Sequence, residues 1–488
     1  MSETSEKYYY TVGLEVHAEL KTNTKMFCSC KNDPDEEKPN INICPVCMAH
    51  PGALPVINKK AIEHVIKVGL AIDGSVADFT EFDRKNYFYP DIPKGYQISQ
   101  YKFPIVSSGH LADFAITRVH LEEDTANNKH FGSDPAGGGA SFSLVDFNRA
   151  GVPLMELVTE AHTFKSVEET AKAASKFAKE YQLLLWYLGV SEANMEKGEM
   201  RVEANVSLSS DPKKLGTKVE VKNLNSFRSV ERAIKYELER MQELLDDGKG
   251  AEIIQETRGW DENKQSTFSQ RSKESSEDYR YFPDPDLPKM KLHEAFDLEA
   301  MKQALPELPV AKRARYEKGF GIKAEDIEVY INDPVLGSWF EGVAGILRDK
   351  DKAKIASNFV TSDYLGIKKS NEEAKLPSVE NFAELVTIFS EGKISSRATK
   401  DILGRIVVND ESPKKIAEEN NLFQTSDEGV LKEIVEKIIT ENPDVVSVYK
   451  SGKENAIMSL VGKIIKESNG SANPQVVIKL LKEKLARP

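Results

Sequence analysis

The sequence of 488 residues has no run of about 18 apolar residues, which excludes a helix that spans a membrane. Its first residues lack the basic-then-apolar pattern of a secretion signal, so we expect a cytoplasmic protein. An excess of positive charge is also missing, because the formal net charge is -12. Indiscriminate binding to polyanions is therefore excluded, and any contact with nucleic acid needs a local basic patch.

Cysteine is scarce, and its positions fall in one short segment. The four residues are Cys28, Cys30, Cys44 and Cys47, and the second pair reads C-P-V-C. In a reducing cytosol, two closely spaced pairs on short loops favour a tetrahedral zinc ion over disulfides. Four thiolates leave no open coordination position, so this zinc would be structural and would hold the loop 33–43. A zinc hydrolase is disfavoured for the same reason, and no cysteine is left over for catalysis.

Apolar and polar residues alternate along the segment 11–20, TVGLEVHAEL. One side of this predicted strand is apolar, and the other carries Glu15 and His17. Read alone, it could be an edge strand with a solvated polar side. Similar alternation recurs at 199–208 and 217–222. Several such strands predict an antiparallel sheet with an apolar back and a charged, concave front, where we place the chemistry.

Helical periodicity accompanies these strands and then replaces them. Helices are predicted at about 59–72, 166–188 and 229–246, against the back of the sheet, with Asn58 and Ser166 as caps of the first two. Later segments contain helical patterns punctuated by prolines and no convincing strand. We therefore expect an α+β protein with three domains. These are an antiparallel β-sheet cradle domain with flanking helices at 1–296, an all-α linker domain at 297–408 and a small all-α tail domain at 409–488.

Three segments combine charge with aromatic or apolar residues. The loop 83–100 contains tyrosines, cations and prolines and could stack and pair with a nucleotide or an RNA end, or be an ordinary packed surface loop. The next strand ends in HLEED, where periodicity cannot decide whether Glu122 or Glu123 faces the site. LVDFNRAGVPLMELVTE sets Arg149 and Glu156 among apolar residues, and a charge in such surroundings needs a partner or an ion.

Positive charge gathers near the end of this acidic chain. From 445 to 488 there are eight Lys or Arg residues against three acids. Such a local excess favours a module that faces a polyanion. A solvated helical face would show the same composition, so both interpretations stay open.

Several longer motifs occur in a fixed order. They are VGLEVHAEL, CPVC with HPGALPVIN, DRKNYFYPDIPKGYQISQ, HLEED, LVDFNRAGVPLMELVTE, KNLNSF, QETR and DYRYFPDPDLP, followed by GKISSRATK and ANPQ. Together they resemble the B subunit of the tRNA-dependent amidotransferase over essentially the whole chain. The resemblance implies an enzyme that converts misacylated Glu-tRNA(Gln) or Asp-tRNA(Asn) to the amide, without fixing which of the two is the substrate.

Members of this family use ATP and Mg²⁺ or Mn²⁺ to phosphorylate the side-chain carboxylate of the tRNA-bound amino acid, and ammonia then displaces the phosphate. The resemblance assigns catalysis and the divalent cation to Glu15, His17, Glu123 and Glu156, with Glu122 as the alternative to Glu123. One histidine among three carboxylates suits Mg²⁺ or Mn²⁺. ATP or the acceptor end is expected against Lys85, Asn86, Tyr87, Tyr89, Lys94, Tyr96, Gln97, Arg149, Arg201, Glu203, Asn205, Lys222, Asn223 and Asn225.

The chain has no spare thiol and no convincing amidase serine motif with which to release ammonia from glutamine. The resemblance therefore implies a heterotrimer with a larger partner, the amidase that hydrolyses glutamine, and a small third protein. It also implies that the tail touches the body of the misacylated tRNA, through Lys453, Lys463, Lys466 and Lys479. The alternative is a noncatalytic tRNA-binding scaffold, whose acids only pair with arginines on the sheet.

Overall fold

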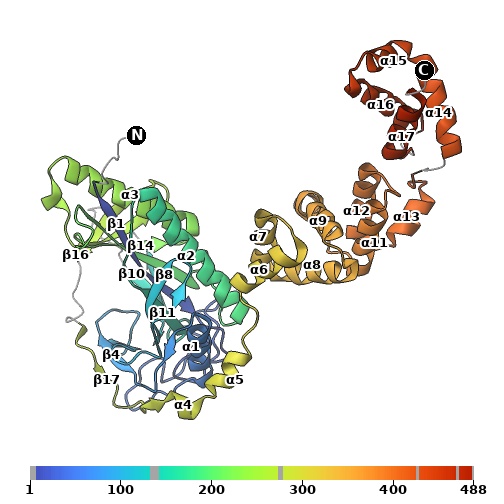
Figure 1. The fold of residues 1–488 in the computed structure, drawn as a ribbon. Helices are drawn as coiled ribbons and strands as arrows, with labels where there is room; N and C mark the ends of the chain where they lie inside the picture. The colour runs from blue at the N-terminus through green and yellow to red at the C-terminus, as the bar shows by residue number, and fades with distance from the viewer. Residues whose placement is uncertain (1–6, 132–141, 273–278, 425–427, 469–471, 486–488) are drawn as a thin grey trace. The chain divides into compact units, whose positions relative to one another are not determined.

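The computed structural model describes residues 7–131, 142–272, 279–424, 428–468 and 472–485 (Figure 1). The chain forms two compact units, Met1–Leu308 and Pro309–Pro488. The predicted fold class is confirmed, because the first unit combines a large sheet with helices and the second is built from helices. The predicted division into three domains, with boundaries near 296 and 409, stays a prediction.

Strand β1 (Tyr9–Glu19) lies in the middle of the main sheet. Its neighbours are β13 (Met200–Ser209) and β11 (Pro153–Thr159), and β8 (Phe114–Glu123) pairs with β11. All these pairs are antiparallel, as predicted. The apolar side of β1 is fully buried, as its alternation predicted, through Val12, Leu14, Val16 and Ala18.

Three long helices cover the apolar face of the sheet (Figure 1). They are α1 (Lys59–Ala71), α2 (Val167–Leu188) and α3 (Phe227–Asp246). Buried side chains of the strands and of these helices form one continuous core. The opposite face, which carries Glu15 and His17, is left for polar contacts.

Polar side chains fix where these helices begin. Asn58 accepts from the Lys60 and Ala61 N–H groups, and Ser166 accepts from the Glu169 N–H group, so both predicted caps are confirmed. The third helix begins two residues before its predicted start. The reason is Ser226, whose side chain caps the helix.

One pair of strands departs from the predicted antiparallel arrangement. Strand β14 (Val219–Leu224) pairs with β13 in the antiparallel sense, but β15 (Glu256–Asp261) runs parallel to β14. Helix α3 lies between them in the chain and carries it back across the sheet, which is the usual connection between parallel strands. Strand β16 (Ser266–Ser272) then pairs antiparallel with β15.

Shorter elements surround the sheet. The remaining strands are β2 (Ser75–Val76), β3 (Phe79–Thr80), β4 (Asp83–Asn86), β5 (Tyr96–Ser99), β6 (Val106–Ser107), β7 (His110–Leu111), β9 (Asn127–Phe131), β10 (Phe142–Asp146), β12 (His162–Phe164), β17 (Phe282–Pro283) and β18 (Met290–Lys291). Strands β17, β4 and β5 form a small sheet of their own, which carries the aromatic loop between β4 and β5. The short helices of this unit are η1 (Gly250–Glu252), α4 (Leu292–Ala295) and α5 (Leu298–Gln303).

The second unit is a series of helices. They are α6 (Pro309–Phe320), α7 (Ala324–Asn332), α8 (Pro334–Leu347), α9 (Lys350–Asn358), the π-helical η3 (Phe359–Tyr364), α10 (Leu365–Ser370), α11 (Val379–Ser390), α12 (Ser396–Asn409), α13 (Pro413–Glu419), α14 (Glu428–Glu441), α15 (Pro443–Lys450), η4 (Glu454–Ala456), α16 (Ile457–Glu467) and α17 (Pro474–Leu485). Helices α14, α16 and α17 pack around a core of their own that includes Val435, Leu460 and Leu480. Within the described ranges, no helix has the length and apolar character needed to cross a membrane.

Candidate active site

Three adjacent strands carry the predicted acidic cluster. In the register of the sheet, His17 on β1 lies opposite Glu156 on β11, and Glu156 lies opposite His120 on β8. The Nε2 atom of His17 is 3.3 Å from Oε2 of Glu156 and 3.8 Å from Oε1 of Glu15. Donor atoms of Glu15, His17 and Glu156 all lie within 4.8 Å of one another. The structure thus brings three of the four predicted cation ligands to one place.

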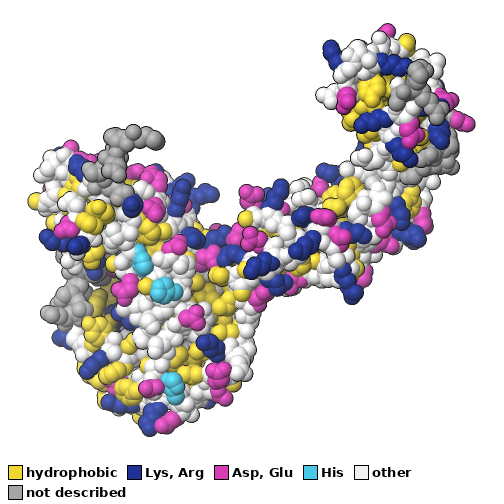
Figure 2. Space-filling model, in the orientation of Figure 1, with side chains coloured by type: hydrophobic (Ala, Val, Ile, Leu, Met, Phe, Trp, Pro, Cys, Tyr) yellow, Lys and Arg dark blue, Asp and Glu magenta, His cyan; other side chains and the backbone are white. Residues whose placement is uncertain are grey.

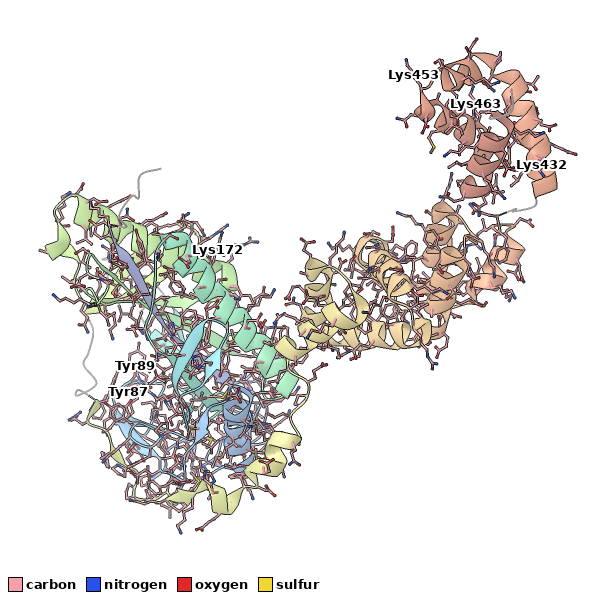
Figure 3. The ribbon with its side chains drawn as sticks, viewed as in Figure 1. Tyr87, Tyr89, Lys172, Lys432, Lys453 and Lys463 are labelled. Atoms are coloured by element: carbon pink, nitrogen blue, oxygen red, sulfur yellow. The ribbon has the colours of Figure 1, made fainter. Side chains whose placement is uncertain are left out.

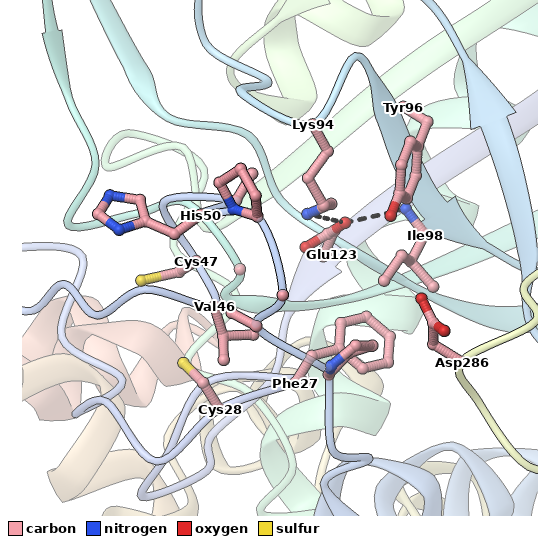
Figure 4. Close-up of a pocket in the computed structure, with 16 residues that line it drawn as sticks. Phe27, Cys28, Val46, Cys47, His50, Lys94, Tyr96, Ile98, Glu123 and Asp286 are labelled. Carbon is pink, nitrogen blue, oxygen red and sulfur yellow. Dashed lines mark hydrogen bonds and ion pairs between the residues drawn. The ribbon is translucent and has the colours of Figure 1, made fainter.

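The neighbouring residues Glu122 and Glu123 face opposite ways. Glu122 lies on the cluster side of β8, with its Oε1 atom 3.5 Å from Nε2 of His17. Glu123 points to the other side, where its Oε1 atom is 2.6 Å from the Lys94 ammonium and accepts from the Ile98 N–H at 2.9 Å (Figure 4). Pairing with β11 stays in register at this point, so no bulge turns Glu123 inward. The structure therefore places Glu122, the alternative, at the cluster and Glu123 apart from it.

Crowding of charge shifts the pKa values of the cluster. Burial raises the pKa of Glu15 to about 7, and the negative charges of Glu156 and Glu203 act in the same direction. Burial opposes protonation of His17, but the interaction with Glu156 and the charges of the nearby carboxylates outweigh it and raise its pKa to about 9. The protein by itself thus keeps a proton on His17, where a divalent cation could take its place. Carboxylates with an imidazole are a donor set that fits Mg²⁺ or Mn²⁺.

A cavity of about 360 Å³ opens beside Glu15 and His17. Its lining residues are Glu15, His17, Lys85, Tyr87, Tyr89, Asp91, Thr125, Glu203, Lys222 and Tyr279. Five of the side chains predicted to bind ATP or the acceptor end, namely Lys85, Tyr87, Tyr89, Glu203 and Lys222, are therefore gathered here. Figure 3 marks two of them, Tyr87 and Tyr89, in the first unit.

Two ammonium groups of this cavity face carboxylates. Burial disfavours the charge of Lys85, but the negative charges of Glu122 and Glu156 prevail and raise the pKa of Lys85 above its usual range. The Nζ atom of Lys222 is 2.6 Å from Oε2 of Glu203. Both lysines are therefore cationic at neutral pH, and such groups bind phosphate oxygens well.

The predicted arginines converge on Asp124, which is buried. The Nη2 atom of Arg201 is 3.0 Å from Oδ2 of Asp124, and Nε of Arg149 is 3.6 Å from the same oxygen. Arg149 also donates to the carbonyl groups of Thr125 and Ala126, at 2.9 and 3.1 Å. The partner that Arg149 was predicted to need is therefore a neighbouring acid, and both arginines hold the segment after β8.

Lys94 and Tyr96 line a different cavity from the one beside Glu15. Its volume is about 230 Å³, and Glu123, Cys28 and Cys47 also contribute to its walls (Figure 4). These two residues belong to the predicted loop but not to the gathered set. The predicted contact of the loop with ATP is therefore divided between two cavities.

The predicted amide side chains act mainly within the fold. Asn86, Gln97 and Asn223 donate to backbone carbonyl groups at 3.0, 2.7 and 2.9 Å. Asn225 donates to Oδ1 of Asn223 at 3.1 Å, and the buried Oδ1 atom of Asn205 has no hydrogen-bond partner in the described part of the chain. None of the five lines the 360 Å³ cavity. Their predicted contact with substrate is not reproduced by the walls of that cavity.

The four cysteines come together as predicted. The Sγ atoms of Cys28, Cys30, Cys44 and Cys47 lie within 4.8 Å of one another, and all four are free thiols. The Sγ atoms of Cys44 and Cys47 are 3.9 Å apart, and the Cys44 N–H donates to Cys47 Sγ at 3.1 Å. This all-sulfur donor set fits a tetrahedral zinc ion with no open position.

The predicted tail lysines are exposed on the last helices. Lys453 precedes η4, Lys463 and Lys466 are on α16, and Lys479 is on α17. Figure 3 marks Lys453 and Lys463. Lys463 bonds to Asn442, and acidic and cationic side chains are interspersed on the face shown in Figure 2. The local excess of positive charge is thus a scatter of exposed lysines.

Sequence reasoning missed four residues of this region. Asp91, Thr125 and Tyr279 line the cavity, and His120 faces Glu156 across the β8–β11 pair. Tyr279 comes from a distant segment, whose backbone carbonyl accepts from Asn86. Only the motif DYRYFPDPDLP pointed to that segment, and no local pattern could have placed its tyrosine in the cavity.

Family models match both units. Residues 10–297 match the GatB/GatE catalytic domain, and residues 338–485 match the GatB domain. The sheet with its carboxylate cluster and cavity therefore lies within a catalytic domain of the GatB/GatE class.

Whole-length relatives agree with this class. The B subunit of the aspartyl/glutamyl-tRNA(Asn/Gln) amidotransferase from Gloeothece citriformis is 40% identical over 98% of both chains, and that from Persephonella marina is 42% identical over 97% of this chain and 98% of its own. The chloroplastic/mitochondrial B subunit of the glutamyl-tRNA(Gln) amidotransferase from Physcomitrium patens is 41% identical over 99% of this chain and 86% of its own. The chain belongs to the family of amidotransferase B subunits.

Proposed function

We propose that this chain performs the ATP-dependent amidation of Glu-tRNA(Gln), Asp-tRNA(Asn) or both. A side-chain carboxylate oxygen of the tRNA-linked amino acid attacks the γ-phosphorus of ATP, and ADP leaves. Ammonia then attacks the acyl carbon, loses a proton and displaces inorganic phosphate, which leaves the amide. Phosphorylation is needed because an unmodified carboxylate oxygen is a poor leaving group.

The convergence of Glu15, His17 and Glu156 beside a cationic cavity supports this proposal most strongly. These residues would hold Mg²⁺ or Mn²⁺, and Glu122 takes the place in the cluster that was expected for Glu123. A bound ion supplies the charge neutralisation that phosphoryl transfer needs. Loss of the His17 proton frees the imidazole nitrogen for this purpose.

Side chains around the cavity would hold the two anionic substrates. Lys85 and Lys222 supply positive charge for phosphate oxygens or for the attacking carboxylate. The rings of Tyr87 and Tyr89 offer flat surfaces for a base of ATP or of the acceptor end. Phe88, which is 82% exposed between them, would extend this surface.

Ammonia must come from another protein. We infer a cytoplasmic heterotrimer, in which a partner amidase hydrolyses glutamine and a small third protein completes the assembly. The four cysteines would carry a structural zinc ion, since their donor set has no free position. The exposed lysines of the tail would contact the tRNA body through its phosphates.

ADP formation by the assembled complex tests the catalytic proposal. With misacylated tRNA, ATP and ammonia, we expect ADP release that depends on the tRNA, and a decrease of at least about 100-fold in Glu15→Gln and Glu156→Gln. Glu239→Gln, an exposed position on α3, is the matched control and should keep full activity. Unchanged activity in both cluster variants would support the noncatalytic scaffold instead.

A further inference from the structure

Strand β8 places two side chains beside Glu156 that the first cation does not need. His120 lies directly opposite Glu156 in the β8–β11 pair, and its Nε2 atom is 3.5 Å from Oε2 of Glu156. Donor atoms of His120, Glu122 and Glu156 lie within 4.8 Å of one another, and all three residues are buried. They form a second donor group, which shares Glu156 with the group of Glu15 and His17.

His120 is poorly explained as a structural residue. It is 2% exposed, and its Nδ1 atom has no hydrogen-bond partner in the described part of the protein. The contact of its Nε2 atom with Glu156, at 3.5 Å, is too long for a good hydrogen bond. A buried polar group without good partners is costly, so its retention beside two carboxylates points to a ligand.

One ion could not readily use all these donors, because the acids approach Glu156 from opposite directions. Glu15 is opposite Val158 of β11, whereas Glu122 is opposite Leu154. Four residues of a strand span about 13 Å. Glu156 lies between these two positions, so its carboxylate can reach toward both groups.

We propose that His120, Glu122 and Glu156 bind a second divalent cation, Mg²⁺ or Mn²⁺, and that Glu156 bridges it to the first. This inference rests on the proposed function. Pairs of cations about 3.5–4 Å apart, bridged by a carboxylate, are a recurrent arrangement for displacement at phosphorus. Here both reactants, the amino-acid carboxylate and the ATP phosphates, are anionic, so two ions would reduce the repulsion between them.

Mn²⁺ binding to the full-length chain, measured by electron paramagnetic resonance, tests the second site. We expect two Mn²⁺ per chain with a spin-coupled signal, and one Mn²⁺ with an uncoupled signal in His120→Gln. His110→Gln, at an exposed histidine on β7, is the control and should still bind two. If His120→Gln does not fold, Glu122→Gln should show the same loss of one ion.

One Mn²⁺ in the wild-type chain, or two in His120→Gln, would overturn the second site. The ADP assay separates this failure from failure of the proposed function. If only the second site is wrong, Glu15→Gln and Glu156→Gln still abolish ADP formation. If the proposed function is wrong, these variants keep their activity whatever number of ions is bound.

Discussion

Affinity for a divalent cation should rise steeply with pH, because the ion competes with protons. The ion needs His17 neutral and Glu15 ionised, whereas the protein alone has pKa values of about 9 for His17 and about 7 for Glu15. Binding therefore releases protons below these values. The sign follows directly: affinity falls as the pH is lowered and levels off above about pH 9.

Both groups contribute to the size of this effect. Between pH 6 and pH 8 His17 stays mostly protonated in the metal-free protein, so it contributes about 100-fold in affinity. Glu15 titrates within the same interval and contributes about 10-fold more. The expected change is thus about 1000-fold, which corresponds to about 4 kcal/mol.

Titration with Mn²⁺ at constant ionic strength, with free Mn²⁺ followed by electron paramagnetic resonance, measures this change. Glu15→Gln removes one of the two titrating groups, so its weaker affinity should vary by only about 100-fold over the same interval. A wild-type affinity that changes less than about 10-fold between pH 6 and pH 8 would refute the reasoning.

Three further predictions concern separate parts of the molecule. Lys85→Met should lower ADP formation by about 100-fold through loss of a cation beside the reacting anions, whereas Lys172→Met, at an exposed position on α2, should have no effect. Cys44→Ser should lower the zinc content, measured by elemental analysis, and expose the cysteine loop to proteolysis; wild-type protein with well under one zinc ion per chain would contradict the zinc proposal. The double variant Lys453→Glu with Lys466→Glu should weaken tRNA binding by about 10-fold or more and reduce its salt dependence, and equal affinity would exclude these contacts.

Much of the first unit could be predicted because its strands and helices have one buried side. Regular alternation in 11–20 predicted which side chains of β1 enter the core and which face the site. Asn58 and Ser166 predicted helix starts through the chemistry of capping. The parallel pair β14–β15 was not predictable in this way, because strand direction follows from how α3 crosses the sheet.

The candidate site could be predicted only in part, since it depends on register between distant strands. Glu15 and His17 share a strand face, so their proximity follows from alternation. Glu122 and Glu123 are both buried, and only pairing with β11 shows that Glu122 faces the cluster. Tyr279 is brought to the cavity by contacts far apart in sequence, which no local pattern contains.

Anomalous diffraction at the manganese edge, from crystals soaked in Mn²⁺, tests the central claim most directly. We predict a peak about 2.1 Å from the donor atoms of Glu15, His17 and Glu156, in the hollow of the sheet. The absence of any peak at these residues, with Mn²⁺ bound elsewhere on the protein, would contradict the proposed catalytic site.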